Sequence, residues 1–199
     1  MFVSDIHLNN FRNYKEKNIE LSEGINIFYG DNANGKTNII ESMYICCTGK
    51  SFRAKKDAEM VLIGEEMGKV EVELDRNGIN KNIEFLITKN NKKQIKVNGI
   101  KLLKISELFG NLNVVLFSPE DIEFVKGEPS FRRRFFDLLI SQIKPSYMGL
   151  LQDYYKNLEQ KNNLLKSYKR PSDIELDIWD EKLAERLSSL PYLPSPSRG

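Results

Sequence analysis

Gly30-Asp31-Asn32-Ala33-Asn34-Gly35-Lys36-Thr37 is the stretch that decides the fold of this chain. It matches the phosphate-loop pattern G-x-x-x-x-G-K-[ST] at every fixed position. Glycine at both ends of the loop allows backbone torsions that turn successive N–H groups inward, around phosphate oxygens. Lys36 is expected to reach the β- and γ-phosphates, and the Thr37 hydroxyl to ligate Mg²⁺. The stretch therefore predicts a site for ATP and Mg²⁺.

The segments on either side of this loop fit the context that it needs. Residues 25–29 read as a short buried strand that runs into the loop. Residues 38–47 read as the helix that leaves it, with one apolar face made of Ile39, Ile40, Met43 and Cys47. Strand, loop and helix in this order would bring the positive end of the helix dipole to the phosphates.

Length, charge and cysteine usage limit the protein class. With 199 residues, of which 40% are hydrophobic, the chain can build one ordinary core and a small second lobe. Its net charge is only +2, but residues 126–170 carry ten Lys/Arg against four Asp/Glu, a local net of +6. The only cysteines, Cys46 and Cys47, are adjacent and cannot pair with each other without strain. Because no apolar run is long enough to span a membrane and no signal peptide is evident, we expect a soluble cytoplasmic protein.

Short alternating segments predict antiparallel β-structure around the loop. Residues 2–8 and 18–21 are predicted as two strands that precede the loop strand. Residues 69–103 alternate between apolar and charged positions and are interrupted by turn signals such as Asn77-Gly78, which predicts an antiparallel meander. We expect the outward charges of this meander to form a solvated face, with the single histidine, His7, at the surface.

A second apolar segment, residues 114–117, is predicted as a strand that ends at Ser118-Pro119-Glu120-Asp121. Acids after an apolar strand are typical of a Walker B motif, whose Asp holds Mg²⁺. Ser-Pro separates these acids from the strand, however, and a helix start with Ser118 as its N-cap accounts for them. We therefore assign Glu120 and Asp121 to a helix start.

The region after Pro129 is predicted to be helical. The first helix carries Arg132, Arg133 and Arg134 in succession, so these side chains fan over more than half of its circumference. From Pro145, an apolar heptad pattern broken at Lys161 predicts a second helix, and residues 174–187 predict a third, so that the last two could form a hairpin. The hairpin could protrude as an arm or pack on the lobe. We expect an ATPase lobe over residues 1–128, a helical arm or lid lobe over 129–187, and a disordered or non-native tail over 188–199.

Several motifs, taken together and in order, resemble the RecF family. They are Phe11-Arg12-Asn13-Tyr14, the phosphate loop with its following Asn38-Ile39-Ile40-Glu41, Gly49-Lys50-Ser51-Phe52-Arg53, Phe117-Ser118-Pro119-Glu120-Asp121 through Glu128-Pro129, and Arg132 to Asp137. Residues 156–162 resemble the start of the family's helical arm, with Lys161 where Arg is usual. The resemblance covers residues 1 to about 187.

This resemblance implies a fold and a function. The fold is the N-terminal half of an α/β, ABC-type, SMC-like P-loop ATPase head, with an antiparallel β meander and a helical hairpin lobe. The implied function is ATP binding and DNA binding in DNA replication, recombinational gap repair and the SOS response. Implied partners are DNA at single-stranded/double-stranded junctions or gaps, RecR and RecO, which together assist RecA loading, and a second copy in an ATP-dependent homodimer.

The resemblance also implies roles for single residues. Gly30, Asp31, Asn32, Ala33, Asn34, Gly35, Lys36 and Thr37 would hold ATP, with Arg12 and Asn13 beside them. Arg53 would sense the γ-phosphate, although from the residues alone it could equally be an ordinary solvated side chain. Arg132, Arg133 and Arg134 are candidate DNA contacts. The family's signature motif and true Walker B lie in a C-terminal half, so this stretch alone is expected not to perform the family's weak DNA-dependent ATP hydrolysis.

The alternative from another class is a small-molecule P-loop kinase, in which Arg132–Arg134 would act as a lid over the phosphates. Two strands ahead of the loop and heptad-patterned helices fit a kinase poorly.

Overall fold

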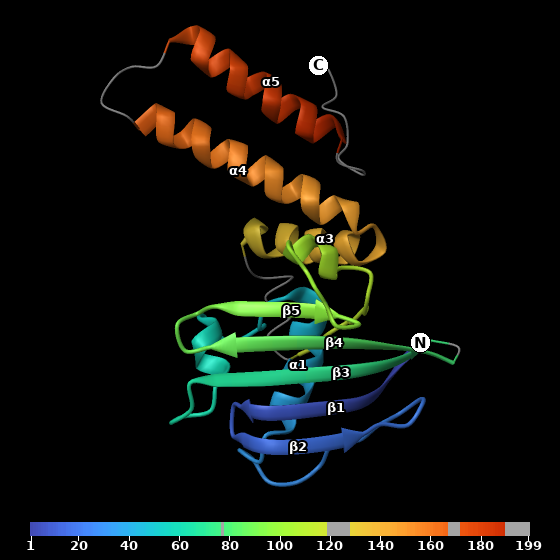
Figure 1. Ribbon diagram of the computed structural model, residues 1–199. Helices are drawn as coiled ribbons and strands as arrows, with labels where there is room; N and C mark the ends of the chain where they lie inside the picture. The colour runs from blue at the N-terminus through green and yellow to red at the C-terminus, as the bar shows by residue number, and fades with distance from the viewer. Residues whose placement is uncertain (77, 119–127, 167–171, 190–199) are drawn as a thin grey trace. The chain divides into compact units, whose positions relative to one another are not determined.

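The computed structural model describes residues 1–76, 78–118, 128–166 and 172–189 (Figure 1). The chain forms two compact units, Met1–Gly127 and Glu128–Gly199. None of the helices in the described ranges is both long enough and apolar enough to cross a bilayer.

The first unit is built on one antiparallel sheet with the strand order β2-β1-β3-β4-β5-β6 (Figure 1). Its strands are β1 (Phe2–Phe11), β2 (Tyr14–Glu20), β3 (Met67–Arg76), β4 (Ile79–Thr88), β5 (Lys93–Val97) and β6 (Ile100–Lys101). The predicted N-terminal strands and the predicted meander are thus confirmed, joined in a single sheet by the pairing of β1 with β3.

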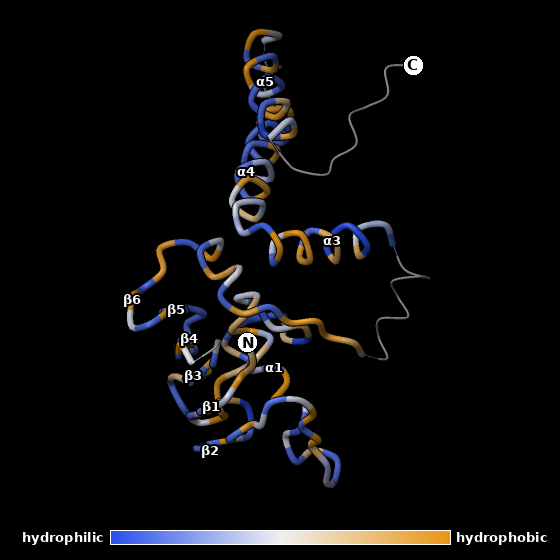
Figure 2. The backbone as a smooth tube through the Cα atoms, turned by 90° about the vertical axis from the view of Figure 1, so that its right-hand side faces the viewer, coloured by the Kyte–Doolittle hydropathy of each residue, from blue (hydrophilic) through white to orange (hydrophobic). Residues whose placement is uncertain are grey.

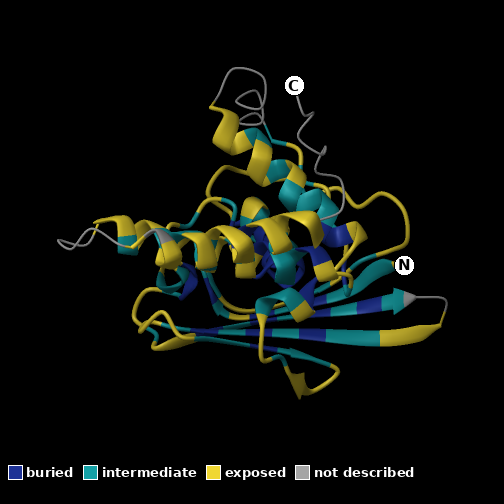
Figure 3. Cartoon of the chain, turned by 90° about the horizontal axis from the view of Figure 1, so that it is seen from above, coloured by how far each residue is buried: buried dark blue, intermediate teal, exposed yellow. Residues whose placement is uncertain are grey.

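One face of the sheet carries the core. Residues on each strand alternate between this inner face and solvent, as the banded strands of Figure 3 show. The inner face is lined by buried aliphatic and aromatic side chains: Ile6, Leu8, Val70, Val72, Leu74, Ile83, Phe85 and Ile87. The helix α1 (Lys36–Thr48) lies against it (Figure 1) and adds Ile39, Ile45, Cys46 and Cys47 to the same cluster. Two short 3₁₀ turns, η1 (Asp57–Met60) and η2 (Ile105–Leu108), bury Met60 and Leu108 beside them.

The buried face of α1 differs from the predicted apolar face. Ile39 and Cys47 are buried as expected, but the side chain of Ile40 is 37% exposed. The helix also buries three polar residues, Glu41, Ser42 and Thr48. The Ser42 hydroxyl donates to the Ile39 carbonyl within the helix, whereas the partners of Glu41 come from elsewhere in the chain and are described with the site below.

The two apolar segments predicted as strands, residues 25–29 and 113–117, are not strands in the structure and do not join the sheet, so the strand predictions are wrong for the described chain. Each turns one side chain toward the core, Phe28 and Val114 respectively. Leu116 is half-buried, and the other large apolar residues are exposed: Ile25, Ile27, Tyr29, Val115 and Phe117. The second segment shows as a hydrophobic stretch in Figure 2 that runs up to the residues drawn in grey. A strand needs a neighbouring strand that bonds to it along its length, and none of the described strands pairs with either segment. The predicted helix start at Pro119, Glu120 and Asp121 lies outside the described residues.

The second unit consists of α3 (Pro129–Ile143), α4 (Ser146–Lys166) and α5 (Asp173–Ser189). The helices α4 and α5 run side by side as a hairpin (Figure 1), which confirms the predicted lobe. Lys161, the polar residue that interrupts the apolar pattern of α4, forms an ion pair with Asp180 of α5. At the other end of α4, the buried Tyr147 donates its hydroxyl hydrogen to the carboxylate of Asp137 on α3 at 2.6 Å. Ser188 and Ser189, the first two residues of the predicted tail, are instead the last residues of α5, and residues 190–199 lie outside the described residues.

Candidate nucleotide-binding site

The phosphate loop is an exposed turn that leads into α1. Gly30, Ala33 and Gly35 have positive φ angles of 134°, 67° and 88°, and such torsions turn backbone N–H groups toward one side of a loop. The helix begins at Lys36, directly after the left-handed Gly35. Its first free N–H groups and its positive dipole end therefore lie at the loop, as anion binding requires.

Lys36 folds back over this loop. Its ammonium nitrogen donates to the carbonyl oxygens of Gly30 at 2.8 Å and Asp31 at 2.6 Å. This arrangement places a positive charge at the mouth of the loop. The Thr37 side chain is on the first turn of α1 and is exposed, so its hydroxyl is available as an oxygen ligand. Loop, lysine and hydroxyl together fit a nucleotide phosphate with a divalent cation.

The turn between β1 and β2 packs directly on the phosphate loop. The side-chain amide of Asn13 donates to the Ala33 carbonyl at 3.5 Å, and the Tyr14 hydroxyl donates to the Asn34 carbonyl at 3.1 Å. A Cβ atom on Gly35 would lie 2.6 Å from the Tyr14 hydroxyl oxygen. Glycine is thus required at position 35 both for its positive φ and for this close approach.

Behind the loop, four side chains form what we call the Glu41 cluster: Arg12, Glu41, Ser51 and Arg53. The Glu41 carboxylate is fully buried, yet it accepts four hydrogen bonds. Arg12 donates to both of its oxygens, at 2.6 and 2.9 Å, Arg53 donates to one at 2.7 Å, and the Ser51 hydroxyl donates to the other. Burial acts to raise the pKa of Glu41, but the hydrogen bonds from Arg12, Arg53 and Ser51 outweigh it and hold that pKa below its usual value. The carboxylate is therefore charged at neutral pH.

The two arginines of the Glu41 cluster are bound to different extents. All three guanidinium nitrogens of Arg12 donate hydrogen bonds, two to Glu41 and one to the Glu59 carbonyl at 2.8 Å. Arg53 uses a single nitrogen, which donates to Glu41 and to the side-chain oxygen of Asn38. Within the described part of the chain, no partner is recorded for its other two nitrogens, and its side chain is 38% exposed. Arg53 thus keeps donors for a ligand, whereas Arg12 is committed to the protein.

A chain of side-chain amides connects this cluster to the phosphate loop. Asn38, the residue after Thr37, accepts from Arg53 and donates to the side-chain oxygen of Asn13 at 2.6 Å. Asn13 in turn donates to Ala33. The structure therefore brings Arg12, Asn13 and Arg53, three residues singled out by resemblance, to the edge of the loop. Sequence reasoning assigned no role to Glu41 or Ser51, because nothing in the spacing of a polar helix position shows that two distant arginines converge on it.

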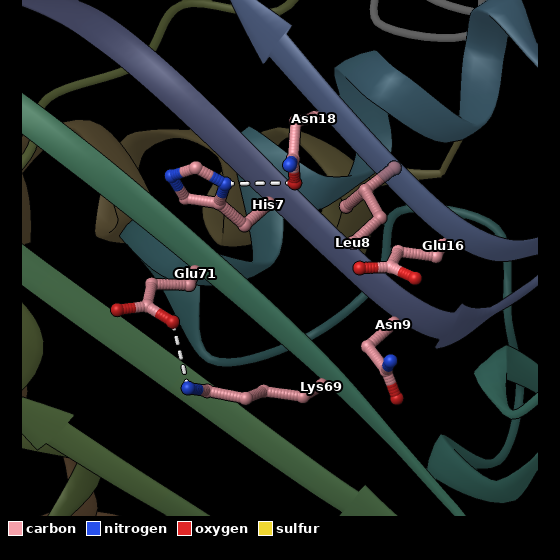
Figure 4. Close-up of a pocket in the computed structure, with 7 residues that line it drawn as sticks. All are labelled: His7, Leu8, Asn9, Glu16, Asn18, Lys69 and Glu71. Carbon is pink, nitrogen blue, oxygen red and sulfur yellow. Dashed lines mark hydrogen bonds and ion pairs between the residues drawn. The ribbon is translucent and has the colours of Figure 1, made fainter.

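The opposite face of the sheet carries charges as well, but they are at the surface. Lys69, Glu71, Glu84 and Lys96 form what we call the outer-face cluster, in which Lys69 contacts Glu71 at 2.6 Å and Glu84 at 3.3 Å. Beside it is a shallow hollow that His7, Asn9, Glu16 and Asn18 also line (Figure 4). His7 forms a hydrogen bond of 2.9 Å with Asn18. Among the described residues no group of three or more His, Cys, Asp or Glu side chains could hold a metal ion.

The candidate DNA contacts lie in the second unit, on the first two turns of α3. Arg133 and Arg134 are exposed and Arg132 is half-buried. All three arginines belong to the +6 segment of residues 126–170, in which basic residues outnumber acidic ones by ten to four.

A phosphate loop at the start of a helix that packs on an antiparallel sheet, with a helical hairpin in the second unit, is the fold of the N-terminal half of an ABC-type, SMC-like P-loop ATPase head. Comparison with solved structures shows the likeness of fold: a structure of an SMC ATPase, 20% identical, superposes with a TM-score of 0.54 over 70% of this chain and 99% of its own. The sequence model of the AAA domain family matches residues 5–190. The chain belongs to this family and corresponds to the N-terminal part of the RecF proteins.

The RecF relatives are similar over nearly the whole chain. The DNA replication and repair protein RecF of Alkaliphilus oremlandii is 45% identical over 184 residues, 92% of this chain and 50% of the relative. That of Acetivibrio thermocellus is 47% identical over 192 residues, 96% of this chain and 52% of the relative. The structure of the recombination mediator protein RecF-ATP is 41% identical, with a TM-score of 0.87 over 93% of this chain and 50% of its own. The chain thus spans about half the length of the relatives it matches.

Proposed function

We propose that this chain is the ATP-binding part of a DNA replication and repair protein of the RecF type. Residues 1–128 would form the nucleotide-binding lobe and residues 129–187 a helical lobe. The observation that carries the proposal is the phosphate loop with Lys36 at its mouth, in a sequence 41% identical to a protein solved as RecF-ATP.

In this proposal the backbone of Gly30–Thr37 surrounds the phosphates, and Lys36 exchanges its two carbonyl acceptors for phosphate oxygens. Thr37 would ligate Mg²⁺, which neutralises phosphate charge when it is bound. Arg53, with two guanidinium nitrogens left for a ligand, is the candidate for the γ-phosphate, while Asn13 and Arg12 support the loop from behind.

The test of the nucleotide site is calorimetric titration of the protein with ATP and Mg²⁺, in the parent and in Lys36→Ala. We expect the variant to lose binding while it keeps its circular dichroism and its unfolding midpoint, because both hydrogen bonds given for the Lys36 ammonium in the described part of the chain go to loop carbonyls. Equal affinity in parent and variant would refute the assignment of Lys36. Lys50→Ala is the matched control, since that lysine is exposed and lies beyond the end of α1.

DNA is the proposed macromolecular ligand, bound through its phosphates by the basic segment of residues 126–170. Such contacts depend little on sequence and weaken steeply with salt. Titration of labelled gapped and fully duplex DNA between about 50 and 200 mM salt tests this, because backbone contacts lose much of their affinity over that range. An affinity that does not change with salt, or that is unaffected by replacing Arg132, Arg133 and Arg134 with Ala, would contradict it.

The finer parts of the proposed function rest on the resemblance to the RecF family. They comprise action at single-stranded gaps with RecO and RecR to assist RecA loading, a role in the SOS response, ATP-dependent homodimerisation, and a cytoplasmic location. Cross-linking of the chain with and without ATP is the direct test of dimerisation.

A further inference from the structure

We propose that Glu41 is a positioning residue for the nucleotide site. It holds the guanidinium group of Arg53 so that the remaining nitrogens of that group meet the terminal phosphate of ATP. The preference for ATP over ADP then depends on a buried carboxylate that contacts neither nucleotide. This inference rests on the nucleotide-binding function proposed above.

The first support is that Arg12 and Arg53 share one carboxylate as their hydrogen-bond acceptor. One oxygen of Glu41 accepts from Arg12 at 2.9 Å and from Arg53 at 2.7 Å, so a single carboxylate fixes both arginines. Arg12 is further held by the Glu59 carbonyl, and its backbone, at φ 55°, is in the left-handed region. Arg12 is therefore held by a second contact besides Glu41, whereas the position of the Arg53 guanidinium group depends on Glu41.

The second support is the direction in which Arg53 extends. The nitrogen that Glu41 holds also donates to Asn38, one residue beyond the proposed Mg²⁺ ligand Thr37. Glu41 itself lies one helical turn after Thr37 on α1. The carboxylate thus ties Arg53 to the same helix that carries the phosphate loop, and Asn38, the other acceptor of that nitrogen, is connected to the loop through Asn13.

The third support is charge. Two arginines and one glutamate leave a net positive charge of one at this edge of the loop, and Arg12 is the less exposed of the two arginines, at 17% against 38%. Without Glu41 the two cations would repel each other and Arg53, the more exposed one, would turn to water. Glu41 therefore keeps the hydrogen-bond donors of Arg53 at the nucleotide site and supplies no donor of its own.

The experiment measures the ratio of ADP to ATP dissociation constants for the parent, Glu41→Gln, Arg53→Ala and the double variant. Glutamine keeps the size of the side chain but cannot hold a charged guanidinium strongly. We expect Glu41→Gln to lower the ratio on the order of tenfold, the equivalent of one charge-assisted hydrogen bond, with ADP affinity little changed. The double variant should show no further drop beyond Arg53→Ala, because both changes remove the same contact.

A purely structural role would give another pattern: Glu41→Gln would weaken ATP and ADP equally, or its effect would add to that of Arg53→Ala, and either result overturns the proposal. Glu16→Gln, an exposed carboxylate on the outer face of the sheet, is the matched control and should leave the ratio unchanged. If Glu41→Gln does not fold, Ser51→Ala removes one of the donors to Glu41 and should lower the ratio in the same direction by a smaller factor; an unchanged ratio would overturn the proposal.

A measurement without nucleotide separates this proposal from the proposed function. The Nε–H signals of Arg12 and Arg53 in ¹H–¹⁵N spectra, assigned with Arg→Lys variants, report the position of each guanidinium group. Both signals should shift in Glu41→Gln and stay in place in Glu16→Gln. An Arg53 signal that does not respond to Glu41→Gln overturns the positioning role, whereas a parent that binds neither nucleotide overturns only the proposed function.

Discussion

The Glu41 cluster and the outer-face cluster are built from the same kinds of side chain on opposite sides of one sheet, yet their surroundings differ. Glu41 has no exposed surface, whereas Glu71 and Glu84 are 25% and 22% exposed. In the first cluster the acceptor cannot reach water, so every hydrogen bond to it must come from protein. In the second, water can replace any partner. A buried cluster can therefore fix the position of its members, while an exposed one only adjusts the surface charge.

The largest effect on stability should follow from removing the carboxylate of the Glu41 cluster. We expect Glu41→Ala to lower the free energy of unfolding by about 3 kcal/mol, because removing one partner of a buried ion pair leaves the others uncompensated. The value is at the lower end of that range since Arg12 and Arg53 can still reach water. Urea unfolding followed by circular dichroism measures it, with Glu16→Ala as the control. A loss under about 1 kcal/mol, the size of an exposed pair, would mean that burial makes no difference here.

The next effect is the pH dependence of the stability that Glu41 contributes. The folded pKa of Glu41 is below the ordinary 4.5, so its stabilising contribution is fully present above about pH 4.5 and is lost as pH falls through the folded pKa. The difference in unfolding free energy between the parent and Glu41→Gln should therefore stay constant from pH 7 to about 5 and shrink below that. A difference that persists at the lowest pH at which both proteins fold would assign the effect to packing instead.

A smaller effect is expected on the outer face. Burial acts to raise the pKa of Glu71, but hydrogen bonds from Lys69 and Asn82 lower it overall. Because the group is partly exposed, we expect Glu71→Gln to cost less than about 1 kcal/mol, and raising the salt concentration to reduce that cost further. Unfolding in low and high salt checks this, and the corresponding cost at Glu41 should depend much less on salt.

The smallest effect should come from the edge of the outer-face cluster. Lys96 reaches Glu84 only at 3.5 Å, so Lys96→Gln is expected to change stability by no more than about 0.5 kcal/mol. A cost as large as that of Glu71→Gln would show that the four charges act as one network.

The parts of the fold that sequence could predict are those whose signals are local. Asn77-Gly78 and the alternation on either side of it predicted the β3–β4 hairpin, because turn chemistry and side-chain period lie next to each other in the chain. The same reasoning was wrong for residues 25–29 and 113–117, because apolar composition predicts burial and says nothing of which strand, if any, supplies the hydrogen bonds.

The candidate site divides in the same way. The phosphate loop was predicted from eight consecutive residues, whereas Glu41 was missed because its donors, Arg12, Ser51 and Arg53, lie 29, 10 and 12 residues away. The resemblance named both arginines as neighbours of the nucleotide, but only their distances show that a single carboxylate holds them.

The two cysteines at the end of α1 make it possible to measure how often this helix separates from the sheet. Cys46 and Cys47 are both buried against the sheet, and burial raises the pKa of Cys46 far above its usual value and that of Cys47 to about 11. Thiols in this state react with alkylating reagents only after the helix leaves the sheet. The rate of alkylation therefore measures how often α1 separates from the sheet, without any engineered label. A ligand at the phosphate loop that slows this rate would show that binding at the start of α1 also stabilises the packing of its last turn.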